Sequence, residues 1–262
     1  MDEIRVSGWA ELQQALYADS WQADLERFRS NFAFRGRNDV AEDLRTSLLR
    51  LGGDPREVEA HLLRNFRKYA QRRDVPFDSS WNWLALAQHH GLPTRLLDWT
   101  YSPLVALHFA TARMEFYDRD GVVWMVDYVQ AQKEAPQPLR SVLEDQEMVV
   151  FTAELLEEAA GGLATLERLA GDDYVVFLEP PSLDERIVNQ YGLFSLMSRP
   201  EARLDDWLDS RAELARRVVI PAELKWEIRD KLDQANVTER VLFPGLDGLS
   251  RWLARYYAPR RG

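Results

Sequence analysis

The side chains in this sequence that are best suited to catalysis or ligand binding lie close together between positions 88 and 100. This segment reads QHHGLPTRLLDWT, and it holds two histidines, an arginine, an aspartate and two threonine hydroxyls. Arg95 and Asp98 stand among apolar neighbours, and a buried charge is costly unless it is paired. Two interpretations are open: the charges satisfy partner groups in the core, or they shape a ligand pocket. His89 and His90 have the chemistry of acid–base groups or of donors to phosphate.

The histidines do not predict a metal site. Adjacent histidines on a regular helix cannot both face one ion, and no H-x-x-x-H or H-E-x-x-H pattern is present. The chain has no cysteine, which excludes disulfides, Cys-ligated zinc and cysteine nucleophiles. It also lacks a P-loop, a G-x-G-x-x-G motif and a G-x-S-x-G elbow, so no standard nucleotide motif or serine hydrolase is indicated.

A second candidate is Arg35, which follows an apolar run and precedes Gly36. An arginine fork beside a glycine allows side chain and backbone to approach an anion closely. The alternative is that Arg35 pairs with a carboxylate at the edge of the core.

Thr100 and Ser102 form the third candidate, because they stand where an expected strand leads into a helix. Free N–H groups at a helix N-terminus favour phosphate. The alternative is that Ser102 serves only as the N-cap of the helix that Pro103 opens.

A basic run between residues 60 and 73 is the fourth candidate. It contains no acidic residue, and helical spacing places most of its cations on one side. The cations are Arg64, Arg67, Lys68, Arg72 and Arg73. Such a stripe is typical of a solvated helix face, and the other interpretation is contact with a nucleic acid or nucleotide.

These candidates belong to a chain with an ordinary globular composition. It has 262 residues, 46% hydrophobic and 29% charged, and its 33 basic and 43 acidic residues give a net charge of −10. That balance argues against a surface that binds nucleic acid or anionic membrane throughout. No apolar run approaches membrane-spanning length, and the acidic N-terminus does not resemble a signal peptide. We therefore expect a cytoplasmic protein of one domain, residues 1–262, without a membrane contact.

Short apolar runs bounded by Gly or Pro predict six strands. They cover residues 32–36, 95–99, 121–126, 174–178, 192–196 and 217–220. Helices are expected at 8–18 with Ser7 as N-cap, and at 41–50, 55–73, 80–90, 103–112, 152–170 with a break at 161–162, 184–190, 221–234 and 248–257. Residues 130–142 are expected to form a loop. This pattern predicts an α+β fold with a central split mixed sheet and a helical insertion after the first strand.

Three segments resemble the FRG domain family. They are Phe34-Arg35-Gly36, the run from Gln88 to Ala110, and Arg186-Ile-Val-Asn-Gln-Tyr-Gly-Leu-Phe194. The resemblance spans residues 28–197 and leaves 198–262 as a C-terminal extension. It implies a bacterial or phage-associated protein of the kind found in phage-defence or toxin loci.

The same segments are more distantly similar to ADP-ribosyltransferases. The similarity implies an ADP-ribosyltransferase-like fold and NAD as substrate, with Arg35 on the NAD diphosphate or ribose, Thr100 and Ser102 at the nicotinamide ribose, and Gln190 at the position of the catalytic glutamate. Because Gln carries no charge, Glu185 or Asp98 would have to substitute for that carboxylate. Glu239, before Val-Leu-Phe-Pro244, also resembles a glutamate that precedes a strand.

Three functions follow as hypotheses. The first is an NAD-using ADP-ribosyltransferase-like enzyme without a metal, whose acceptor is a protein or nucleic acid. The second is a non-catalytic module that senses a nucleotide or a phage component. The third is a nucleic-acid-directed enzyme that uses His89, His90 and Asp98. We expect one cleft to bring together Arg35, His90, Arg95, Asp98, Thr100 and Gln190. The other expected ligand contacts are Phe34, Gly36, His89, Thr94, Trp99 and Ser102.

Overall fold

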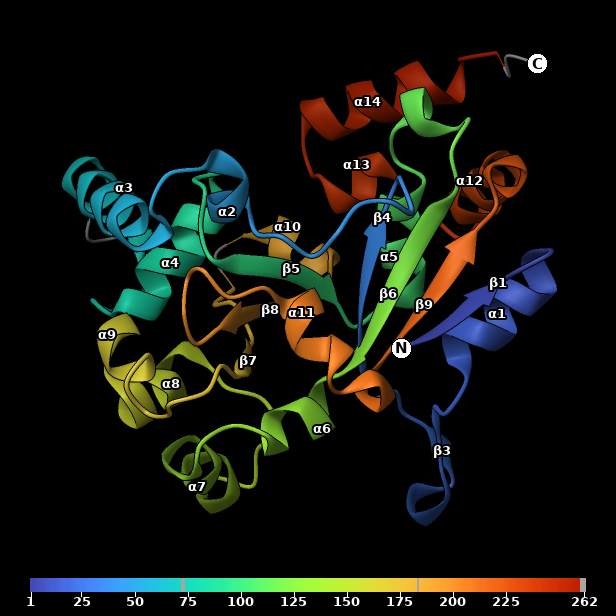
Figure 1. Ribbon diagram of the computed structural model, residues 1–262. Coiled ribbons are helices and arrows are strands. Elements are labelled where there is room, and N and C mark those ends of the chain that lie inside the picture. Colours follow the sequence, from blue (N-terminus) through green and yellow to red (C-terminus); the bar gives the residue numbers. More distant parts are fainter. Residues whose placement is uncertain (72–73, 183, 260–262) are drawn as a thin grey trace.

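The apolar runs assemble into one mixed sheet in the computed structural model, which describes residues 1–71, 74–182 and 184–259 (Figure 1). Within this part of the chain the sheet has seven strands in the order β1-β9-β6-β4-β5-β8-β7. Only β1 and β9 pair in parallel, and the other neighbours are antiparallel. In sheet order, the strands are β1 (Asp2–Arg5), β9 (Ala215–Ile220), β6 (Gly121–Asp127), β4 (Phe32–Arg37), β5 (Leu96–Thr100), β8 (Gly192–Met197) and β7 (Val175–Leu178). The predicted α+β class and all six predicted strands are confirmed.

The sheet separates in the middle, between β4 and β5. These two strands share a single pair, Phe34 with Thr100, whereas β4 and β6 are paired over six residues from Phe32 to Arg37. In Figure 1, β5 leaves the line of β4 and runs toward the opposite side of the molecule. Two strands that diverge leave backbone and side chains free to face an opening, and the candidate site lies there.

One helix from the N-terminal region, one from the middle of the chain and one from the C-terminal region cover one face of the β1-β9-β6-β4 half. They are α1 (Trp9–Tyr17), α5 (Pro103–Ala110) and α12 (Lys225–Gln234). Leu16 of α1, Leu107 of α5 and Ile228 of α12 pack with Phe34 in one buried cluster. α13 (Glu239–Leu242) and α14 (Leu246–Tyr256) follow α12.

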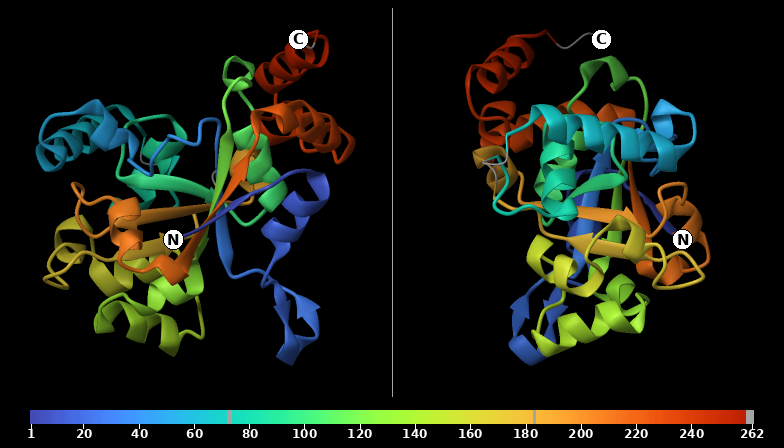
Figure 2. Two further views of the ribbon diagram at one scale, coloured as in Figure 1. Left: turned by 45° about the vertical axis from the view of Figure 1, so that its right-hand side comes forward. Right: turned by 90° about the vertical axis from the view of Figure 1, so that its left-hand side faces the viewer.

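The predicted helical insertion lies between β4 and β5. It consists of α2 (Ser47–Leu51), α3 (Pro55–Tyr69) and α4 (Ser80–His89), and Figure 2 shows it beside the β5-β8-β7 half. A second group packs against this half, with α7 and α8 supplying Leu139 and Leu156 to the core around Trp81 of α4. This second group consists of α6 (Tyr128–Lys133), α7 (Gln137–Asp145), α8 (Ala153–Ala160) and α9 (Leu163–Leu166). Two more helices follow in the chain, α10 (Glu185–Asn189) and α11 (Leu204–Asp209).

Several local predictions are wrong. Residues 130–142 are not a loop. They hold the end of α6 and the first part of α7, and Pro138 stands in the first turn of α7, where proline is tolerated. Gly8, not Ser7, is the N-cap of α1, and Ser7 instead donates to Glu11. The helix expected at 41–50 begins only after Thr46, whose hydroxyl accepts from Leu49 N at 3.2 Å.

Strands β1 to β3 and helices α11 and α13 also escaped prediction. β1 is the polar sequence DEIR at the sheet edge, and β2 (Trp21–Gln22) forms a small hairpin with β3 (Arg27–Phe28). Short 3-10 turns complete the chain at η1 (Ala23–Leu25), η3 (Met114–Phe116), η4 (Ala212–Leu214) and η5 (Ala222–Leu224). No helix in the described ranges combines the length and apolar character needed to cross a membrane.

Candidate functional site

A cavity of about 460 Å³ opens where β4 and β5 diverge. Strand β4 supplies Arg35 and Arg37, and β5 supplies Asp98 and Thr100. The end of α4, the segment after α5 and the end of α10 close the remaining sides through Gln88, Arg113, Arg186 and Gln190. Segments far apart in the sequence therefore meet at one site, as predicted for Arg35, Asp98, Thr100 and Gln190.

Arg35 points to the cavity because neighbouring strand residues face opposite sides of the sheet. Phe34 lines the cavity, while its fully buried side chain packs in the core beside α5. The Arg35 guanidinium donates to the carbonyl oxygen of Asp98 and lies 3.8 Å from the Asp98 carboxylate. Burial lowers the pKa of Arg35, and the charge of Asp98 only partly opposes this effect. A cation that is desolvated and incompletely neutralised favours a further anion.

Arg37 adds a second cation on the same side of β4. It pairs with Glu42, and burial together with the charge of Arg35 lowers the pKa of Arg37 to about 10. Among the described residues, the Nε–H groups of Arg35 and Arg37 are both buried without a hydrogen-bond partner. The cavity thus presents two guanidiniums whose donors are incompletely used.

Asp98 is the one carboxylate among the described residues that line this cavity. Its side chain is 60% exposed, and its Oδ2 accepts from Gln88 Nε2 at 2.8 Å. Gln88 is itself oriented by Thr94, whose hydroxyl donates to Gln88 Oε1 at 2.5 Å. Thr94 is fully buried, so it positions Gln88 and does not contact a ligand.

Hydrogen bonds of Thr100, Ser102 and Gln190 join the end of β5 to α5, α10 and the C-terminal extension. Thr100 Oγ1 donates to the Gln190 carbonyl at 2.7 Å and accepts from Ser102 N at 3.0 Å. Ser102 caps α5 by accepting from Val105 N at 3.3 Å, so the N-cap interpretation is the correct one. Gln190 Nε2 donates to Leu242 O at 3.0 Å, which ties the cavity to the C-terminal extension.

Arg95 does not join the cavity. It is 2% exposed and donates to Glu59, Glu167 and the Ser198 carbonyl. The ion pairs with Glu59 and Glu167 hold α3 and α9 against the start of β5. The core-pairing interpretation is therefore correct for Arg95 and the pocket interpretation is wrong.

Gly36 and Trp99 also have structural roles. A Cβ on Gly36 would lie 1.8 Å from the Ala106 carbonyl oxygen, so glycine is required there for α5 to pack against β4, a cause other than the anion approach predicted. Trp99 is 4% exposed and its indole donates to Ser195 Oγ at 2.8 Å, which places it in the core.

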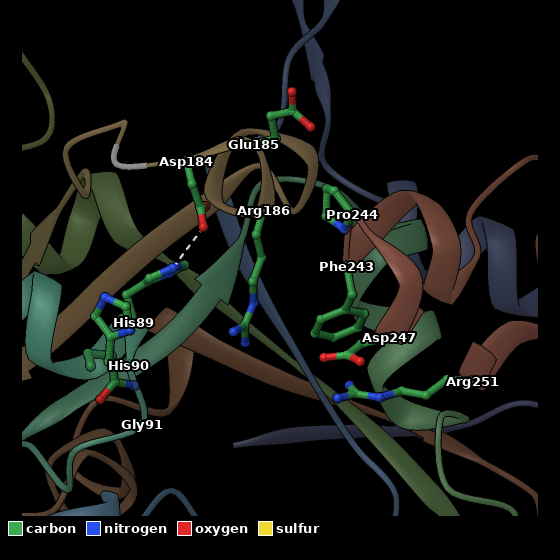
Figure 3. Close-up of a pocket in the computed structure, with 11 residues that line it drawn as sticks. His89, His90, Gly91, Asp184, Glu185, Arg186, Phe243, Pro244, Asp247 and Arg251 are labelled. Carbon is green, nitrogen blue, oxygen red and sulfur yellow. Dashed lines mark ion pairs between the residues drawn. The ribbon is translucent and has the colours of Figure 1, made fainter. Parts of the chain in front are cut away.

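The two histidines and Glu185 line an adjacent cleft (Figure 3). His89 Nε2 lies 2.8 Å from Asp184 Oδ2, and burial lowers the pKa of His89 although Asp184 opposes this. His90 faces the same cleft rather than the Arg35 cavity. The structure pairs His89 with Asp184 and Asp98 with Gln88, and His89 and Asp98 both line a small pocket of about 50 Å³ between the two spaces. The third hypothesis therefore stays a prediction.

The sequence interpretation missed Arg37, Gln88, Arg113 and Arg186 as cavity residues. Arg37 was detectable, because a residue two positions after Arg35 on a strand faces the same side. Gln88 and Arg186 open two of the quoted motifs. Arg113 carried no such signal.

The family model of the FRG domain matches residues 30–119. The chain contains an FRG domain. The matched segment supplies both diverging strands, the insertion between them, and α5. No curated protein and no solved structure matches the chain.

Gln190 and Arg186 lie outside the matched FRG segment, yet they complete its cavity. The expected strand after Glu239 does not form, because Glu239 begins α13. Its buried carboxylate instead pairs with Arg229 and Arg255, and those pairs and hydrogen bonds lower the pKa of Glu239 to about 2 against the effect of burial.

The basic helix of the FRG domain is partly neutralised. Arg67 pairs with Asp78 at 2.8 Å and lies over the Trp83 ring, and Arg64 contacts His61. Arg72 and Arg73 lie outside the described residues. Helix α3 therefore presents fewer free cations than the sequence pattern indicates.

Proposed function

We propose that the Arg35 cavity binds a nucleotide of the NAD class and that the protein uses NAD as an ADP-ribosyl donor. The observation that carries this proposal is the meeting of two incompletely neutralised arginines and one accessible carboxylate in a nucleotide-sized cavity. Cavities of this size hold small-molecule ligands.

In this proposal the diphosphate lies against the β4 arginines. Planar guanidiniums bind phosphate through paired charge-assisted hydrogen bonds, and Arg35 Nε–H has no partner among the described groups. Arg113 and Arg186 line the same cavity and add positive charge. A phosphate would relieve the mutual repulsion of these cations.

Asp98 takes the role of the carboxylate that stabilises the ribosyl cation. Glu185 lines the neighbouring cleft, and the Gln190 amide is bonded to Leu242 O, so Asp98 is the better placed substitute. As the bond from ribose C1′ to the nicotinamide nitrogen breaks, nicotinamide leaves with the electron pair. The acceptor then bonds to C1′ and releases its proton.

The similarity of the Phe-Arg-Gly strand and the Asp-Trp-Thr-Tyr-Ser segment to ADP-ribosyltransferases supports NAD as the nucleotide. An ADP-ribosyltransferase-like fold is part of the same proposal. The FRG assignment supports an effector role in a phage-defence or toxin locus.

Arg35→Gln is expected to weaken NAD binding about tenfold to a hundredfold for each phosphate hydrogen bond that is lost. The variant loses one or two charge-assisted hydrogen bonds to phosphate, each contributing about 1.5–3 kcal/mol. Isothermal titration calorimetry with NAD measures the affinity, and a thermal melt monitors folding. Arg140→Gln on α7 is the matched control, since the Arg140 side chain donates to Gln137 and does not line the cavity. An unchanged affinity in Arg35→Gln, or no NAD binding by the wild type, would contradict the proposal.

Asp98→Asn is expected to retain NAD binding within a few-fold and to slow NAD consumption about a hundredfold. Asparagine keeps an oxygen that accepts from Gln88 but loses the charge that stabilises the ribosyl cation. Nicotinamide release measures the reaction, with cell lysate as the source of acceptors. Wild-type binding without any nicotinamide release would favour the second hypothesis, a nucleotide-sensing module.

A further inference from the structure

A second cleft of about 750 Å³ adjoins the Arg35 cavity. Its walls are the end of α4, the start of α10 and the C-terminal segment from Phe243 to Arg251. Gln88, Gly91 and Arg186 line both spaces, so the two lie next to each other. The cleft is large enough for a second ligand of nucleotide size.

Two arginines from different elements face this cleft. Arg186 comes from α10 and Arg251 from α14, and their guanidiniums lie 5.1 and 5.4 Å from the centre of the Phe243 ring. Figure 3 shows both side chains directed toward the middle of the cleft. Among the described residues neither has an ion-pair partner. Two like charges held on one ring and aimed at one space repel each other unless an anion lies between them.

The carboxylates that line the cleft do not supply that anion. Asp184 is paired with His89 and caps α10 by accepting from Ile187 N at 3.2 Å. Glu185 points away from the two guanidiniums in Figure 3. Asp247 lies next to the Arg251 guanidinium in Figure 3 without forming an ion pair within the described ranges, and it leaves Arg186 without a counter-charge.

We propose that Arg186 and Arg251 bind a phosphate group of a second ligand, which lies beside the nucleotide in the Arg35 cavity. The Phe243 ring holds both guanidiniums in place through cation–π contacts, which reduces the loss of side-chain freedom on binding. The matched FRG segment supplies one wall of this cleft at the end of α4, and the two arginines come from α10 and α14, which lie after that segment. It does not depend on the identity of the first nucleotide or on its consumption.

Arg251→Gln tests the subsite, because Arg251 lines the second cleft and not the Arg35 cavity. The probe is inorganic pyrophosphate, titrated calorimetrically into the full chain with and without saturating NAD. We expect Arg251→Gln to weaken pyrophosphate binding about tenfold or more. Arg240→Gln is the matched control, since Arg240 also stacks on an aromatic ring, Trp252, but lies outside the cleft. Melting temperatures of both variants are expected to equal that of the wild type.

The Arg35→Gln variant shows whether pyrophosphate binds in the Arg35 cavity or in the second cleft. Pyrophosphate binding that falls in Arg35→Gln and not in Arg251→Gln would place the anion in the nucleotide cavity and overturn the subsite. Absence of binding to the wild type would also overturn it. Binding that depends on Arg251 in a protein that does not bind NAD would sustain the subsite while the proposed function fails.

Discussion

Gly36→Ala is expected to lower the free energy of unfolding by about 3 kcal/mol or more, the upper part of the range for overpacked cores. A Cβ at this position would lie 1.8 Å from the Ala106 carbonyl oxygen and 2.6 Å from the Ala110 nitrogen. Both are backbone atoms of α5, so no side-chain rotation relieves the contact. Helix α5 would have to move away from β4 and open the core around Phe34.

Thermal or urea unfolding measures this effect, and a loss of this size lowers the melting temperature by roughly 6–12 °C in a chain of this length. Gly171→Ala is the matched control, because a Cβ there meets no atom within 4 Å and the backbone needs no left-handed conformation. We expect the control to melt within about 2 °C of the wild type. A Gly36→Ala protein that is equally stable but fails to bind nucleotide would instead restore the anion-approach role of Gly36.

The fold was predictable where the information is local. Six strands are apolar runs bounded by Gly or Pro, and their burial makes the pattern visible. Strand β1 was not predictable, because Asp-Glu-Ile-Arg contains only one apolar residue. The segment becomes a strand by pairing with β9, which lies near the other end of the chain. The helix α7 was not predictable either, because a proline ends a helix in its interior but is accepted in its first turn. The local sequence does not show which of the two applies.

The site was predictable in part. Arg35 and Asp98 meet as expected, although they are 63 residues apart. Arg95 was placed in the same cleft without regard to strand alternation. Residues 95 and 98 are an odd number of positions apart, so in an extended chain their side chains face opposite sides. The sequence could not show that Gly36 serves α5, because that contact joins β4 to a residue 70 positions away.

Arg95→Met is expected to lower the free energy of unfolding by about 3–5 kcal/mol, because it leaves a buried carboxylate without a partner. The Arg95 and Glu59 side chains are only 3% and 4% exposed. Arg95 Nε lies 2.9 Å from both oxygens of Glu59, and Arg95 Nη2 lies 2.9 Å from Glu167 Oε1. Chemical denaturation measures the loss. Arg56→Met is the matched control, since the 58%-exposed Arg56 pairs with Glu167 from the surface and contributes about 1 kcal/mol at most.

The double variant Arg95→Met, Glu59→Leu separates the cost of the orphaned charge from the value of the pair. Replacing both ions with apolar side chains removes the uncompensated charge, so we expect most of the lost stability to return. Glu167 keeps Arg56 as a partner at 3.2 Å in this variant. A structural Arg95 also predicts that the double variant binds NAD as the wild type does. If the single variant instead melts normally and loses nucleotide binding, Arg95 acts in a ligand pocket, and the assignment of Arg95 to the core would be wrong.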